Sequence, residues 1–167
     1  EHGTNIFEPD EQSLLTEVAG DLAFALHDIE LDQETRLKDE ELRESEVRYR
    51  RLFESAKDGI LILDAKTGKV VDVNPFLTDL LDFSKEEFLG KTVWELGLFG
   101  DLLADKDNFT ELQKKKYIRY EDMLLESRDG RKIYIEFVSN AYMVDSNVIQ
   151  CNIRDITARH RTEEALR

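Results

Sequence analysis

The side chains that most often perform chemistry in proteins are few in this sequence and stand far apart. The three histidines are His2, His27 and His160, and the single cysteine is Cys151. The 37 acidic residues are numerous, but they gather in charged runs that are typical of solvated helix faces. Catalysis needs a nucleophile, an acid–base pair or a metal set that converges, and the sequence shows no metal-spaced cluster and no phosphate-cradling glycine loop. We therefore expect no enzyme activity and no metal site within these residues.

Asp155 and Thr157 have side chains that can accept hydrogen bonds from free backbone N–H groups. The strand-like run Val148 to Arg154 leads directly into Asp155-Ile156-Thr157 and a charged, helix-like tail. Short polar side chains at such a point accept hydrogen bonds from the first turn of a helix. The sequence therefore predicts that Asp155 and Thr157 cap a helix and fix its angle to the strand before it.

Length and charge set the limits on what surrounds these residues. A chain of 167 residues, 41% of them hydrophobic, can bury one ordinary core, which predicts a single globular domain with helical arms. The net charge of −14 and the lack of a basic stripe beyond Lys114-Lys115-Lys116 argue against nucleic-acid and anionic-lipid partners. We expect no membrane contact, since no apolar run approaches the roughly 20 residues that span a bilayer. A lone Cys151 cannot form an internal disulfide, which agrees with a cytoplasmic location.

The first third of the chain predicts a long helix, because residues 9–56 contain almost no turn residues. Its apolar positions alternate in steps of three and four, and an isolated helix with such a seam needs a partner. The dimer seam consists of Leu15, Val18, Leu22, Ala25 and Ile29. A second seam resumes near Leu42 in another phase, beyond a predominantly acidic stretch. Two interpretations stay open: two packing units joined by a bendable segment, or one helix with an exposed middle.

The periodicity changes at Asp58, from which point the sequence predicts short strands and helices. Asn74-Pro75 supplies a helix cap followed by proline at the first helical position. Capping boxes begin at Ser84 and Thr92, and a further helix is expected near residues 107–116. The expected strands are 59–64, 69–73, 117–127, 133–143 and 148–154, with turns at 65–68, 128–131 and 145–147. This order predicts an α+β fold, a five-stranded antiparallel sheet with helices on one face.

The order of these signals resembles the PAS domain family over roughly residues 45–157. The matching motifs, in chain order, are Tyr49-Arg50-Arg51-Leu52-Phe53-Glu54 before Asp58-Gly59-Ile60, Val73-Asn74-Pro75, Phe88-Leu89-Gly90-Lys91, Asp129-Gly130-Arg131 and Arg154-Asp155-Ile156-Thr157. The resemblance implies a small sensor, often dimeric and usually wired in series inside histidine kinases, cyclic-dinucleotide enzymes or transcription regulators.

Upstream of that region, the segment Phe7-Glu8-Pro9-Asp10-Glu11 with Leu14-Leu15 and Val18-Ala19 resembles the last helix of a GAF domain. The expected organisation is therefore a GAF-like tail helix (1–30), a charged helical linker (31–46), a PAS domain (47–156) and the start of an output helix (157–167). His160 lacks the proline-containing box of phosphoacceptor histidines in sensor kinases, and we interpret it as an exposed helix residue.

Strand alternation, anchored on Asp129-Gly130 and Asp155, predicts which side chains face the helix-covered interior. The expected pocket residues are Leu61, Leu63, Leu80, Phe83, Trp94, Phe109, Leu125, Ile135, Phe137, Ile149, Cys151 and Ile153, with Ser139 beside them. An apolar interior of this kind is either a closed core or a site for a small apolar molecule, and the sequence leaves both open.

The resemblance also bears on cofactors. Flavin-binding light sensors of the family read the flavin with amides at positions that here are Leu125, Ile135 and Ile153, none of which can hydrogen-bond. They also need a cysteine on the helix near Trp94, and haem-binding members need a core histidine; this sequence has neither. No cofactor is therefore expected. The resulting hypothesis is a dimeric relay module linked to upstream and downstream domains, which passes a conformational signal through Asp155-Ile156-Thr157; the alternative is a sensor of a small apolar ligand.

Overall fold

The computed structural model describes residues 8–100, 106–142 and 147–167, with only the backbone of Tyr142. The chain divides into two compact units, Glu1–Tyr49 and Arg50–Arg167. Helix α1 (Pro9–Ser55) runs without interruption through the acidic stretch. The large apolar side chains of its first part are exposed, and Phe53 in its last turn is buried. Phe7, the first residue of the GAF-like match, lies outside the described residues.

The second unit is built on one antiparallel sheet in the order β2-β1-β5-β4-β3. Its strands are β1 (Gly59–Asp64), β2 (Val70–Val73), β3 (Tyr117–Glu126), β4 (Lys132–Tyr142) and β5 (Val148–Asp155). The five strands and their antiparallel pairing confirm the predicted fold class. Gly59 pairs with Ile153, so β1 begins beside the end of β5.

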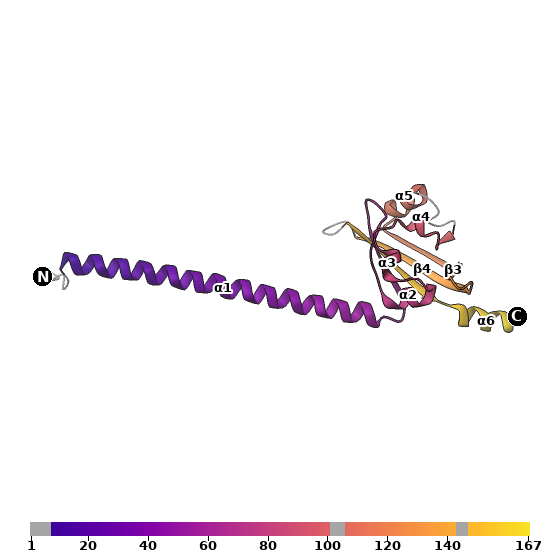
Figure 1. Ribbon diagram of the computed structural model, residues 1–167, viewed down its shortest axis with the longest axis horizontal. Helices are drawn as coiled ribbons and strands as arrows, with labels where there is room; N and C mark the ends of the chain where they lie inside the picture. Colours follow the sequence, from indigo (N-terminus) through magenta and orange to yellow (C-terminus); the bar gives the residue numbers. More distant parts are fainter. Residues whose placement is uncertain (1–7, 101–105, 143–146) are drawn as a thin grey trace. The chain divides into compact units, whose positions relative to one another are not determined.

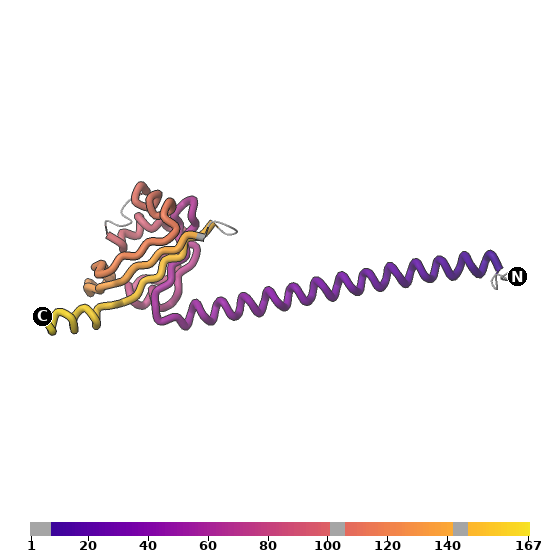
Figure 2. Tube along the Cα trace, turned by 180° about the vertical axis from the view of Figure 1, so that it is seen from behind, coloured from indigo at the N-terminus to yellow at the C-terminus, as the bar shows by residue number. Residues whose placement is uncertain are grey.

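Four short helices follow β2 and lie on one side of the sheet (Figure 1). They are α2 (Pro75–Leu81), α3 (Lys85–Phe88), α4 (Val93–Leu96) and α5 (Lys106–Lys114). The predicted capping boxes account for two of these starts, because the N–H groups of Ser84 and Thr92 donate to Glu87 and Glu95 over 2.8 Å each. Figure 2, the view from behind, shows the strands instead, and shows β5 running into α6 (Thr157–Ala165).

The turns between strands explain the register of the sheet. Gly130 adopts φ +81°, a left-handed conformation that glycine takes at little cost, and its N–H donates to the carbonyl oxygen of Ser127 over 2.9 Å. The predicted Asp-Gly hairpin therefore joins β3 to β4. Asp145 and Ser146 of the other predicted turn lie outside the described residues. Alternation then buries Ile149, Cys151 and Ile153 of β5 on the side of the helices.

Candidate functional site

The junction at the end of β5 is built from three consecutive residues and one residue of β4. The Asp155 carboxylate accepts a hydrogen bond from the N–H of Thr157 over 2.9 Å, as the sequence predicted. The prediction that Thr157 also caps the helix is wrong: its hydroxyl oxygen accepts from the N–H of Tyr134 over 3.0 Å. Ile156 is the N-cap residue, is buried, and donates its N–H to the carbonyl oxygen of Tyr134 over 2.8 Å. The first residues of α6 are therefore bonded to β4.

His160 differs from its prediction as an exposed helix residue. Its side chain is only 20% exposed, and its ring stacks on the ring of Tyr134 with centroids 3.7 Å apart and planes 7° apart. Local sequence was a poor guide to this contact, because the two residues lie 26 positions apart and most of the tail is charged or polar. A helical spacing of four residues from the apolar Ile156 was the one available signal.

Asn74 joins the segments at the start of the domain. Its amide is fully buried and makes four hydrogen bonds, donating to the carbonyl oxygens of Phe53 (3.1 Å) and Asp58 (3.0 Å). The same side chain accepts from the N–H groups of Ile60 (2.8 Å) and Leu77 (3.2 Å). The predicted helix cap is confirmed by the bond to Leu77. Asn74 also ties the last turn of α1 to β1, which the sequence did not reveal.

The twelve expected pocket residues are brought together in one hydrophobic cluster beneath the helices. Nine of them are almost fully buried: Leu61, Leu63, Phe109, Leu125, Ile135, Phe137, Ile149, Cys151 and Ile153. The other three, Leu80, Phe83 and Trp94, are partly buried at its edge. The guanidinium of Arg128 lies 4.3 Å from the centre of the Phe83 ring, and Trp94 packs against Phe109 with centroids 5.6 Å apart.

The interior offers little chemistry for holding a ligand by polar contacts. The Cys151 thiol lies 3.9 Å from the Ser139 hydroxyl, and burial raises the pKa of this thiol to about 12. Cys151 therefore behaves as a small hydrophobic side chain at neutral pH. Among the described residues no group of three or more His, Cys, Asp or Glu side chains could hold a metal ion.

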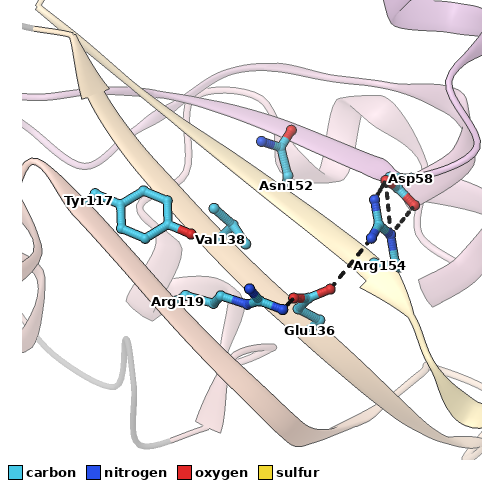
Figure 3. A pocket seen from close by; sticks show the side chains of 7 residues that line it. All are labelled: Asp58, Tyr117, Arg119, Glu136, Val138, Asn152 and Arg154. Carbon is cyan, nitrogen blue, oxygen red and sulfur yellow. Dashed lines mark hydrogen bonds and ion pairs between the residues drawn. The ribbon is translucent and has the colours of Figure 1, made fainter.

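A hollow of about 450 Å³ lies on the opposite face of the sheet (Figure 3). Its lining residues are Asp58, Tyr117, Arg119, Glu136, Val138, Asn152 and Arg154. At its centre Glu136 is buried between two cations: it pairs with Arg119, and its Oε2 lies 3.6 Å from Nη1 of Arg154. Arg154 also pairs with Asp58, Nη2 to Oδ2 over 2.8 Å, and this carboxylate raises the pKa of Arg154.

The charges of this hollow are already paired with one another. Two guanidinium groups meet the carboxylates of Asp58 and Glu136, and Arg119 has a further partner in Glu121 at 2.7 Å. No surplus positive charge is left there to attract an anion. The network instead links β3, β4 and β5 to the segment before β1. This network could not be predicted from the sequence, because outward-facing Arg and Glu look like ordinary surface residues until the strand register is known.

The protein is a small α+β domain: its antiparallel sheet carries helices on one face and is hydrogen-bonded to one helix before it and one after it. The family pattern of the PAS domain matches residues 57–158, which is more than half of the chain. The chain belongs to the PAS domain family.

Relatives of known sequence or structure agree with this assignment. Sporulation kinase E of Bacillus subtilis (strain 168) is 27% identical over 135 residues, which cover 77% of this chain and 17% of that protein. The chain thus spans about a sixth of the curated relative that it matches.

Two solved structures share the fold over most of their length. The PAS domain of an HTR-like protein from Haloarcula marismortui is 26% identical with a TM-score of 0.59, covering 72% of this chain and 99% of that chain. A domain of a sensory box sensor histidine kinase/response regulator from Geobacter sulfurreducens is 26% identical with a TM-score of 0.56, covering 68% and 96%. Within the described part of the chain no helix is long and apolar enough to cross a membrane.

Proposed function

We propose that the chain is a cytoplasmic signal-relay and dimerisation module of a multidomain signal-transduction protein. A conformational signal passes through Asp155-Ile156-Thr157 into α6 and on to a downstream output domain. The observation that carries the proposal is the junction itself: one buried residue, Ile156, separates β5 from α6, and the helix is hydrogen-bonded to β4. Because no flexible linker intervenes, a shift of the strands changes the position of the helix.

The output is proposed to be a kinase domain, so that catalysis lies outside these residues. Two relatives support this choice: one is named a kinase, and the other is a domain of a sensor histidine kinase/response regulator. The match to only 17% of the curated relative agrees with a module inside a longer protein. That the first part of α1 is the last helix of a GAF domain stays a prediction from the sequence.

Dimerisation is proposed to occur through α1. The seam residues Leu15, Val18, Leu22, Ala25 and Ile29 are all exposed in the single chain. A helix of 47 residues that leaves such a seam open gains stability when a second copy covers it. Sedimentation of the chain at micromolar concentration measures this directly, with Leu22→Glu as the variant that places a charge in the seam. A wild-type chain that sediments strictly as a monomer refutes the proposal.

The relay is tested with Asp155→Ala in the full-length protein. This change removes the acceptor of the Thr157 N–H and is expected to uncouple output from input while leaving the sheet folded. The matched control is Asp64→Ala, because Asp64 accepts similar hydrogen bonds from the N–H groups of Lys66 (3.0 Å) and Thr67 (2.7 Å) in the turn after β1, far along the chain from the junction. Regulation that persists unchanged in Asp155→Ala contradicts the relay.

The alternative is a sensor whose apolar interior takes up a small apolar molecule. It is supported by the character of the core cluster, where Leu125, Ile135 and Ile153 offer no hydrogen bonds. No flavin or histidine-ligated haem is expected in this interior. An absorption spectrum and a native mass spectrum of the purified protein separate the two: a colourless protein of ligand-free mass favours the relay, and a co-purified apolar molecule favours the sensor.

A further inference from the structure

Tyr134 of β4 meets the strand–helix junction through three separate contacts. Its carbonyl oxygen accepts from Ile156 (2.8 Å), and its N–H donates to the hydroxyl of Thr157 (3.0 Å). Its ring stacks on that of His160, with 3.7 Å between the centroids. We call this set of four residues the Tyr134 clamp.

The three contacts have different mechanical roles. Hydrogen bonds at Ile156 and Thr157 fix the point where α6 begins, but a helix held only at its first residues can still swing about that point. His160 lies one helical turn further on, and its N–H donates to the carbonyl oxygen of Ile156 over 2.9 Å. Its ring therefore projects from the same helix face as Ile156, back toward the sheet. A contact one turn from the origin fixes the direction of the helix as well.

The side chains of α6 supply little else that could set that direction. No residue of α6 is fully buried, and the pairs Arg159–Glu163 and His160–Glu164 both lie within the helix. The His160–Tyr134 stack is therefore the contact, one turn into α6, that fixes the direction of the helix.

The contact is a ring stack rather than a hydrogen bond. Nδ1 of His160 is buried without a hydrogen-bond partner, and the nearest carboxylate oxygen, Oε2 of Glu164, is 3.7 Å away. The two rings are nearly parallel. A flat, uncharged ring can therefore replace the imidazole, whereas a side chain without a ring cannot.

We propose that Tyr134 and His160 are positioning residues through which strand β4 sets the direction of the output helix. The inference rests on the proposed relay function of the junction and extends it from β5 to β4. Ile133 and Ile135, the neighbours of Tyr134, are buried in the core. A displacement of β4 that begins in the core therefore moves the Tyr134 backbone and ring, and both carry α6 with them.

The experiment measures the direction of α6 by spin-label distances in the 167-residue chain. Labels are attached at Lys66→Cys, in the exposed turn after β1, and at Arg161→Cys, on the exposed side of α6. The native Cys151 does not interfere, because it is buried and its thiol pKa is about 12. Diluting labelled with unlabelled chains removes distances between two copies.

A narrow distance distribution is expected for the wild-type chain and for His160→Phe, which keeps a ring in the stack. His160→Ala and Tyr134→Leu are expected to broaden it. Alanine has a higher helix propensity than histidine, so a broadened distribution in His160→Ala does not reflect a weaker intrinsic helix. The matched control is Arg159→Ala, one residue away on the outer side of the helix, which should stay narrow.

A distribution as narrow in His160→Ala as in the wild type overturns the inference, and so does a broad distribution in His160→Phe. His160→Ala alters an edge of the fold, so the measurement stands even where Tyr134→Leu unfolds the sheet. If the relay proposal fails but this inference holds, the result is different. Regulation of the full-length protein then stays unchanged in Asp155→Ala, while the spin-label distances of the 167-residue chain still respond to His160→Ala.

Discussion

Replacing Asn74 by alanine should destabilise the PAS domain by much more than the loss of an ordinary helix cap. The change removes four hydrogen bonds from a side chain that is fully buried. The Leu77 N–H keeps a second acceptor, the backbone carbonyl oxygen of Asn74 at 3.2 Å. Three groups lose their Asn74 partner: the N–H of Ile60 and the carbonyl oxygens of Phe53 and Asp58.

The magnitude follows from those three groups. A buried polar group deprived of its partner costs about 1–3 kcal/mol, and the second lone pair of each carbonyl oxygen, which can serve another donor, favours the lower end. The expected loss is about 3–4 kcal/mol of unfolding free energy, against a typical total of roughly 5–15 kcal/mol. An N-cap alone is worth about 1 kcal/mol.

Urea unfolding followed by the fluorescence of the single tryptophan measures this loss, because Trp94 packs within the domain. Amide exchange of Ile60 provides a second measurement, since its N–H loses its acceptor and should exchange faster. Ser84→Ala is the matched control: Ser84 is the N-cap of α3, is exposed, and has no comparable partners elsewhere in the described fold. If Asn74→Ala costs no more than Ser84→Ala, the reasoning that Asn74 joins α1 to the sheet is refuted.

Three further predictions concern Gly68, Cys151 and a pair of surface carboxylates. Gly68→Ala should destabilise the domain by roughly 2 kcal/mol in urea unfolding, because φ is +69° and a Cβ would lie 2.6 Å from the Trp94 ring; a neutral result contradicts the close packing there. Cys151 should not react with maleimide at pH 8 in the native chain and should react fully in urea; rapid native labelling contradicts its burial. Hydrogen bonds from Arg128 and Ser127 lower the pKa values of the Glu87 and Asp129 carboxyls, respectively. The contribution of these two carboxylates to stability is therefore complete at neutral pH and is lost as the pH falls below about 4. An unfolding free energy that rises over that acidic range refutes this sign.

Most of the fold could be predicted from the sequence because the motifs that start helices and form turns are local. Asn74-Pro75 and Asp129-Gly130 act through neighbouring residues, so they could be interpreted without knowing the partner strands. Alternation from the Asp-Gly turn then predicted which side chains of β4 and β5 face the core, including Ile135 and Ile153. Binding of an apolar ligand among them stays a prediction.

The contacts that escaped prediction join residues far apart in the sequence. The hydroxyl of Thr157 is chemically able to cap its own helix, and only the register of β4 beside β5 brings the Tyr134 N–H within reach. The stack of His160 on Tyr134 depends on the same register. The Arg119–Glu136 pair likewise forms across two strands. Pairwise geometry of this kind does not appear in hydropathy or in local propensity.

The bond between Asp58 and Arg154 has a consequence for how such domains combine in evolution. These residues stand where the domain body begins and ends, and their side chains meet at 2.8 Å. A segment whose two ends lie together can be inserted into another gene, or duplicated within one, without altering the spacing of the sequences on either side. The same geometry should allow circular permutation: a short link from residue 155 to residue 58, with new termini opened in the exposed turn at Lys66, should give a chain that still folds.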